Sequence, residues 1–328
     1  MNEKGNINNC KNNLLLLIKD LHKIFNLQNF TYNKEIINSK SINVFKVSEK
    51  KFNDKNNKTR ENIISAIINN KIPENYYILK KWFYMKQHIF NYIKKLSNKS
   101  YEKVECINKA GRGHKYDFLL KILYKDGIKE DFMIEFKFNV SLIDDSPQFV
   151  SPMKPSQYMS NSYENYYYDN YLHKLSNMFN IKMPSKEEYL KKIHSTKPKC
   201  MKIYQELYYN GCSESSKFTN KDTDIKFYKF AKELSSDSIK SFINNTELNI
   251  ELLSNYLHTT QKDKIYMLYL NKVFTLQEIN IDDYKIDKVV KNPDKFRYEC
   301  ISKNGKKIKI LLRWKNGNGI AFPAFQIS

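Results

Sequence analysis

The stretch "YDFLLKILYKDGIKEDFMIEFKFNV", residues 116–140, decides how the fold of this chain is interpreted. Its two apolar runs, 116–124 and 131–140, are typical of β-strands. The Lys-Asp-Gly sequence at 125–127 lies between them and favours a tight turn. We therefore predict a β-hairpin, and we note that its apolar runs contain two carboxylates, for which burial is costly.

The alternation of side chains along a strand predicts where these carboxylates lie. Glu135 and Lys137 share one face of their strand, about 7 Å apart, while Ile134 and Phe136 point to the other face and belong to a core. Antiparallel pairing across the turn then brings Asp117 opposite this part of the second strand. Two carboxylates and one ammonium group are thus expected to converge on a half-buried sheet.

This arrangement suits a divalent cation. Neighbouring carboxylates repel each other, and burial opposes their ionisation. Mg²⁺ is commonly held by one or two carboxylates together with water and substrate oxygens, and it can polarise a phosphate or help to ionise a water. A nearby lysine could orient that water or stabilise negative charge. The pattern favours phosphodiester hydrolysis, although Glu-x-Lys also occurs by chance on solvated strands of a lysine-rich chain.

The motif resembles the signature of the PD-(D/E)XK nuclease superfamily, which has the restriction-endonuclease-like fold. Asp117 is followed by Glu135-Phe136-Lys137 within a helix-strand-strand-strand order, and the resemblance covers about residues 76–175. It implies that Asp117, Glu135 and the Phe136 carbonyl hold Mg²⁺, for which Mn²⁺ can substitute. It also implies that Lys137 positions or activates the attacking water. The proline of the signature is replaced by tyrosine at 116.

The resemblance also implies accessory groups. Some members take a further acidic ligand from the first helix, but residues 78–95 contain no Asp or Glu. Glu74 and Glu105 are the substitutes we consider. Gln148 or Gln157 could be the polar residue that some members place after the lysine, or a residue of a loop.

Basic residues near the motif are candidates for contacts with a nucleic acid. "GRGHK" precedes the first carboxylate strand, and its Arg112, His114 and Lys115 could contact phosphates. The alternative is a flexible basic turn. Lys154 is a further candidate for phosphate contact.

A second candidate for nucleic-acid contact lies near the C-terminus. In "RWKNGNG", residues 313–319, Arg313 and Lys315 share one strand face. A two-stranded ribbon can enter the major groove of DNA, where arginine reads guanine. Trp314 lies on the other face and could instead belong to the core of a small sheet.

Composition favours a nucleic-acid partner. The chain has 56 Lys and Arg against 35 Asp and Glu, a net charge of +21, which attracts polyanions such as double-stranded DNA. Coding bias could produce the same excess. Five scattered cysteines without metal-binding spacing indicate reduced thiols. The apolar run "LLLLI" is too short for a signal peptide or a membrane span. We expect an intracellular, soluble protein that is not secreted and has no membrane partner.

Four segments are expected in a chain of the α/β (α+β) class. They are an N-terminal helical segment (1–75), a nuclease core (76–183), a mostly helical segment (184–275) and a C-terminal β-rich segment (276–328). The first includes a polar bridge at 47–62. The last includes a three-stranded meander, because Asn-Gly pairs favour hairpin turns. The tyrosine run "YENYYYDNY" could stack bases or pack into a core.

The favoured hypothesis is a Mg²⁺-dependent DNA endonuclease of sequence-specific restriction type. A homodimer would be one way to cut both strands. The alternative is a non-catalytic nucleic-acid-binding protein that uses the same fold. A third hypothesis, a structural or membrane-surface protein, has less support from these patterns.

Overall fold

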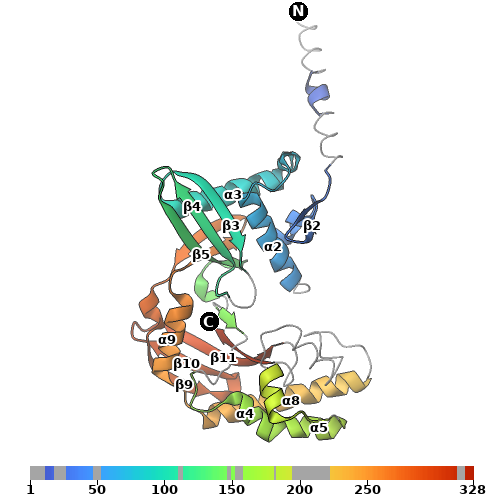
Figure 1. Ribbon diagram of the computed structural model, residues 1–328, viewed down its shortest axis with the longest axis vertical. Helices are drawn as coiled ribbons and strands as arrows, with labels where there is room; N and C mark the ends of the chain where they lie inside the picture. The colour runs from blue at the N-terminus through green and yellow to red at the C-terminus, as the bar shows by residue number, and fades with distance from the viewer. Residues whose placement is uncertain are drawn as a thin grey trace, which may run out of the picture. The chain divides into compact units, whose positions relative to one another are not determined.

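The computed structural model divides into two compact units. Unit 1 comprises Met1–Ile143 and Asp263–Glu278, and unit 2 comprises Asp144–Lys262 and Ile279–Ser328. The structure describes residues 12–17, 27–46, 53–109, 114–145, 149–151, 158–180, 182–193, 222–315 and 322–328. Figure 1 labels many of the helices and strands that the following paragraphs use.

Unit 1 contains a five-stranded mixed sheet with the order β3-β4-β5-β7-β8. Pairing is antiparallel between β3, β4 and β5, parallel between β5 and β7, and antiparallel between β7 and β8. This mixed sheet with its helices confirms the α+β class. The strands are β3 (Tyr101–Asn108), β4 (Phe118–Tyr124), β5 (Lys129–Phe138), β7 (Lys264–Leu270) and β8 (Val273–Glu278).

The predicted hairpin is formed by β4 and β5. Its turn contains Gly127 at φ +82°, a backbone conformation that glycine adopts without strain. Ile134 and Phe136 are buried in the core of unit 1, as the alternation of side chains predicts. Glu135, which lies between them, must therefore point to the opposite face of the sheet.

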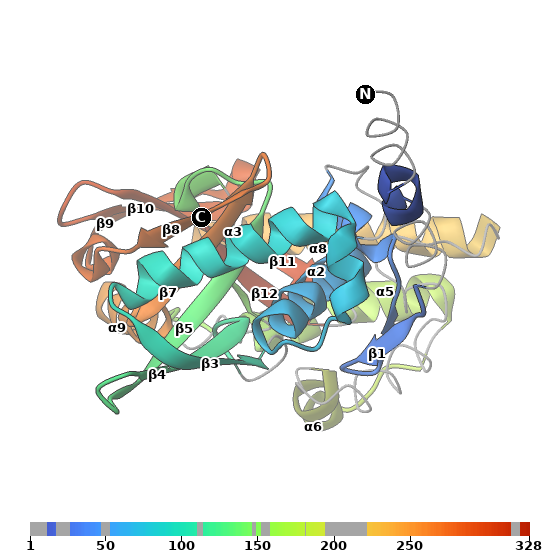
Figure 2. The same ribbon diagram turned by 90° about the horizontal axis from the view of Figure 1, so that it is seen from above.

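Helix α3 (Lys80–Ser97) packs into the same core, and Figure 2 shows it lying across the strands. Its apolar residues recur at helical spacing, and Trp82, Met85, Ile89 and Ile93 are all buried. The remaining elements of unit 1 precede it in the chain. They are β1 (Phe30–Tyr32), β2 (Glu35–Ile37), η1 (Ser41–Phe45), α2 (Asn53–Ile68) and η2 (Glu74–Ile78).

The expected polar bridge is wrong for residues 53–62, which form the first part of α2. Three of its polar side chains, Thr59, Arg60 and Asn62, are buried because they find partners. Arg60 donates from Nε to the Val44 carbonyl at 2.7 Å and lies over the Phe138 ring. Thr59 and Asn62 both bond to the Glu35 carboxylate. Polarity in this stretch therefore reflects buried hydrogen bonding rather than a loop.

Unit 2 contains a second five-stranded sheet, ordered β6-β12-β11-β10-β9. The expected three-stranded meander is present as β10, β11 and β12, and β9 and β6 extend it. These strands are β6 (Phe149–Ser151), β9 (Ile286–Asn292), β10 (Arg297–Ser302), β11 (Lys307–Lys315) and β12 (Phe322–Ile327).

The tyrosine run lies in the helices of unit 2. Tyr163 and Tyr167 are fully buried in its core, which favours the packing alternative over base stacking for these two rings. In the described part of unit 2, the longest helices are α8 (Asp222–Asn245) and α9 (Ile250–Gln261). Shorter ones are α4 (Tyr163–Tyr167), η5 (Tyr168–Leu172), α5 (His173–Phe179), α6 (Lys186–Glu188) and η6 (Tyr189–Ile193). Single 3₁₀ turns are η3 (Ile143–Asp145), η8 (Ile281–Tyr284) and η9 (Pro293–Lys295).

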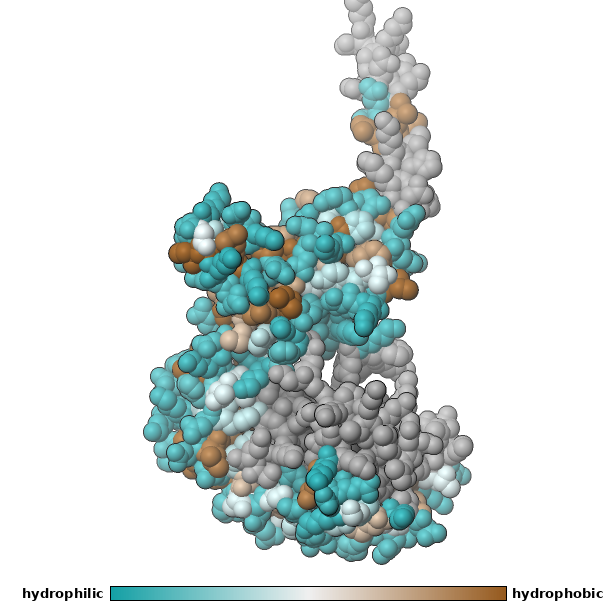
Figure 3. Space-filling model, viewed as in Figure 1, coloured by the Kyte–Doolittle hydropathy of each residue, from teal (hydrophilic) through white to brown (hydrophobic). Residues whose placement is uncertain are grey.

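The surface is mostly hydrophilic on the face that Figure 3 shows, with small apolar patches. In the described part of the chain, no helix has the length and apolar character needed to cross a membrane. Two described cysteines, Cys106 and Cys300, are buried free thiols.

Candidate active site

The hairpin brings the two predicted carboxylates together. Phe118 pairs with Ile134, so the register continued by one residue places Asp117 opposite Glu135. The backbone N–H of Asp117 donates to the Ile134 carbonyl at 2.9 Å. The Asp117 carboxylate accepts from the Phe136 N–H at 2.8 Å. These two bonds fix the Asp117 side chain against β5 just before β4 begins.

Two ammonium groups contact the Glu135 carboxylate. Lys137 Nζ lies 2.8 Å from Oε1, and both residues belong to β5, as the motif predicts. Lys264 Nζ lies 3.4 Å from Oε2 and comes from the neighbouring parallel strand β7. Glu135 is 9% exposed and Lys264 is 3% exposed, so these charges interact with little screening by water.

A third carboxylate, Glu61 of α2, interacts electrostatically with both members of the pair. Burial raises the pKa of Glu61 to about 8, with further contributions from Asp117 and Glu135. The buried bonds of Thr59, Arg60 and Asn62 hold this turn of α2 in place. We did not predict Glu61, because its helix was interpreted as a polar bridge.

The pKa of Asp117 is raised in the same way. Burial contributes most and the Glu135 charge next, so that the pKa reaches about 7 instead of 3.8. Lys137 and the Phe136 N–H act in the opposite direction. Burial lowers the pKa of Lys264, while Glu135 raises it. Perturbed carboxyl groups of this kind gather at functional sites more often than elsewhere.

The donor chemistry of the pair fits a hard divalent cation. Two carboxylates from adjacent strands supply oxygen ligands, as Mg²⁺ sites commonly do. The Phe136 N–H points toward Asp117. Since the N–H and C=O of a strand residue lie on the same side of the strand, the Phe136 carbonyl is expected there too. Within the described residues, no group of three or more His, Cys, Asp or Glu side chains is arranged to hold a metal ion.

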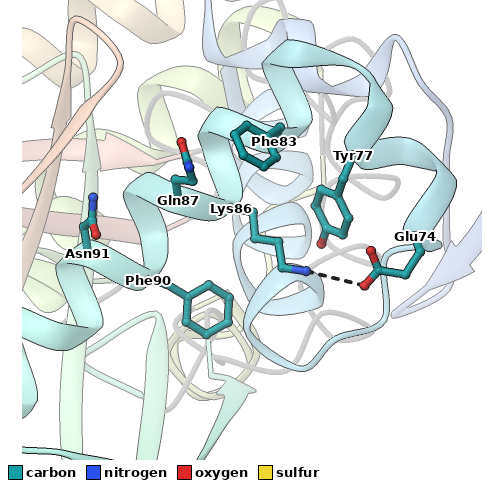
Figure 4. A pocket seen from close by; sticks show the side chains of 7 residues that line it. All are labelled: Glu74, Tyr77, Phe83, Lys86, Gln87, Phe90 and Asn91. Atoms are coloured by element: carbon teal, nitrogen blue, oxygen red, sulfur yellow. Dashed lines mark ion pairs between the residues drawn. The ribbon is translucent and has the colours of Figure 1, made fainter.

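The accessory acids considered from the sequence lie elsewhere in unit 1. Glu105 is exposed on β3, in register with Lys121 rather than with Asp117. Glu74 pairs with Lys86 at 3.5 Å. Figure 4 shows Glu74 and Lys86 in a pocket of about 550 Å³ that is lined by residues of η2 and α3. This pocket is lined by Glu74, Tyr77, Phe83, Lys86, Gln87, Phe90 and Asn91, and it contains none of the carboxylates of the hairpin.

The predicted nucleic-acid contacts are only partly described. His114 is exposed, with its ring centroid 5.9 Å from that of Tyr116, and burial lowers the pKa of its neighbour Lys115. Arg313 is exposed on β11 and donates to Gln326 Oε1 at 2.9 Å. The remaining candidates lie outside the described residues: Arg112, Gln148, Lys154 and Gln157, together with the side chains of Trp314 and Lys315.

No model of a known protein family, no curated protein and no solved structure matches the chain.

Proposed function

We propose that this chain is a metal-dependent DNA endonuclease of PD-(D/E)XK type, with a restriction-endonuclease-like core in unit 1. The observation that carries the proposal is the Asp117–Glu135 pair with Lys137 on the same strand, held at the end of a hairpin. Burial and, next, the charge of Glu135 raise the pKa of Asp117, and a divalent cation would offset both effects.

Each residue has a distinct role in this proposal. Asp117, Glu135 and the Phe136 carbonyl would hold Mg²⁺, or Mn²⁺ in its place, which supplies Lewis-acid stabilisation of charge on the phosphate. Lys137 positions the attacking water and stabilises negative charge as it develops. Glu61 adds a third acid that can hold a proton near neutral pH.

The substrate that fits best is double-stranded DNA, because the net charge of +21 favours a polyanion. Cleavage of both strands of a specific sequence requires two active sites or two successive cuts, which a homodimer would supply. His114, Lys115 and Arg313 are candidates for contacts with the DNA backbone or base edges.

The test is cleavage of supercoiled plasmid by the full chain in Mg²⁺, with and without EDTA. We expect Asp117→Asn, Glu135→Gln and Lys137→Met each to lose at least ~100-fold in rate. Glu102→Gln, which alters an exposed carboxylate of the same sheet, should cleave like the parent. Unchanged cleavage in all three hairpin variants would show that this site does not perform the reaction.

A second function is favoured by one observation: both Glu135 oxygens already contact lysines. A non-catalytic nucleic-acid-binding protein could keep such internally neutralised charges for structure alone. It would bind DNA or RNA with strong salt dependence, and it would show neither cleavage nor thermal stabilisation by Mn²⁺. Stabilisation by Mn²⁺ that disappears in Glu135→Gln excludes it.

A further inference from the structure

The contact between Lys264 and Glu135 is unusual for its depth and its separation in sequence. The two residues are 129 positions apart, and their side chains are 1% and 12% exposed. Burying an ammonium group is costly unless partners compensate for it. Lys137 already pairs with the other oxygen of the same carboxylate at 2.8 Å, so a second buried lysine is more than neutralisation of Glu135 requires.

The register of the sheet shows how the Lys264 side chain reaches Glu135. Lys264 begins β7 and is paired with Met133, whereas Glu135 is paired with Tyr266. The lysine side chain therefore reaches diagonally along the sheet to place its ammonium beside Glu135 Oε2. The charges of Asp117 and Lys137 also act on it, which places it among the charged groups of the hairpin.

The charges around Glu135 indicate that the two lysines occupy the place of a divalent cation. Two ammonium groups, Lys137 and Lys264, contact Glu135, and the Asp117 carboxylate lies opposite Glu135 in the hairpin. Together the two lysines carry the charge of one divalent cation. Lys264 contacts the second oxygen of a carboxylate that a cation would also require.

We infer that Lys264 is a built-in competitor of the divalent cation: it contacts Glu135 in place of the ion, and ion binding displaces it. This inference rests on the proposed metal site of the hairpin. Lys264 is then a positioning residue, which orients the Glu135 carboxylate and sets how tightly the site binds its ion. If Lys264 had only a structural role, replacing it would change the stability of the fold but would not make the site bind its ion more tightly.

The test is Mn²⁺ binding to the full chain by isothermal titration calorimetry. Lys264→Met keeps the aliphatic length and removes the charge, so we expect Mn²⁺ to bind about tenfold more tightly or better. Lys264→Arg keeps the charge and should bind within about threefold of the parent. Lys272→Met, an exposed lysine in the turn after β7, is the matched control and should bind like the parent.

Folding is monitored separately by urea unfolding in EDTA, and Lys264→Gln serves as a second neutral variant if Lys264→Met does not fold. Mn²⁺ affinity that is unchanged or lower in the neutral variants overturns the inference, and so does the absence of binding in every variant. Plasmid cleavage decides the proposed function independently. Cleavage without a gain in affinity removes only the role of Lys264. If the neutral variants bind Mn²⁺ more tightly, Glu135→Gln abolishes this gain and no variant cleaves DNA, then the competition between Lys264 and the ion is supported. The proposed nuclease activity is then rejected.

Discussion

The two units bury polar groups of different kinds. Among the described residues of unit 1, buried charges are Arg60, Glu135 and Lys264, and two of these belong to the hairpin cluster. In unit 2 the buried polar residues are mainly hydroxyl groups, with Glu164 as the charged one, beside a core rich in tyrosine. Hydroxyl groups can be satisfied by single hydrogen bonds, whereas buried charges need partners and are costly to keep. The described part of unit 1 therefore carries more of the costly buried charges, whereas the described core of unit 2 is mainly apolar and aromatic.

The largest expected effect concerns the core of unit 2. Tyr163 is fully buried, packs edge-on against Phe242 with ring centroids 4.8 Å apart, and shares a hydrogen bond of 3.0 Å with Ser238. Tyr163→Ala should lower the free energy of unfolding by about 3–5 kcal/mol, because it leaves a large cavity. Tyr163→Phe should cost only about 1 kcal/mol, the contribution of one hydrogen bond. Urea unfolding measures both, and unchanged Mn²⁺ affinity in Tyr163→Phe would support the contrast between the units.

An intermediate effect is expected at Glu61. Glu61→Gln removes the third acid beside the hairpin pair, and cleavage of plasmid in Mg²⁺ should fall roughly 10–100-fold, as for groups that support a metal site. The control is Glu102→Gln, an exposed carboxylate on β3. Parental activity in Glu61→Gln would mean that this residue belongs with the structural charges and would weaken the contrast between the units.

A graded effect is expected from pH. Unfolded Asp117 and Glu61 ionise near 3.8 and 4.5, whereas their folded pKa values are about 7 and about 8. Between these values the folded state binds more protons, so the stability present below pH 4 is lost as the pH rises toward 8. From the size of these pKa shifts, the loss is at most about 4 kcal/mol for each group.

This pH dependence can be measured by urea unfolding in EDTA from pH 4 to pH 8. Asp117→Asn and Glu61→Gln should each flatten the decline, whereas Asp126→Asn, at an exposed turn, should leave it unchanged. A decline that persists in the double variant Asp117→Asn/Glu61→Gln would assign the pH dependence to other groups.

The sequence predicts the local parts of the candidate site well. The β4–β5 hairpin, the opposition of Asp117 and Glu135, and the buried face of Ile134 and Phe136 all follow from side-chain alternation and one turn. These features depend on residues close together in the chain, where periodicity carries the information. Helix α3 is predicted for the same reason.

The long-range parts of the site could not be predicted. Glu61 lies in a polar helix in which Asn62 and Arg60 are buried through bonds to Glu35 and the Val44 carbonyl. Hydropathy alone assigns such a stretch to a loop. Lys264 begins an apolar run, "KIYMLYL", within a segment expected to be mostly helical. Parallel pairing of this run with β5 has no local signal, because it depends on where a distant strand joins the sheet.

The position of β7 in the chain has a consequence for the order of events during synthesis. A nascent chain that has reached residue 143 already contains the residues of β3, β4 and β5. The edge of β5 that pairs with β7 stays unpaired until residues 264–270 have been synthesised. More than a hundred residues of unit 2 must leave the ribosome first, which takes on the order of ten seconds at typical translation rates. During that interval the Glu135 carboxylate lacks its contact with Lys264, so the charged cluster of unit 1 is completed only after most of unit 2 has been synthesised.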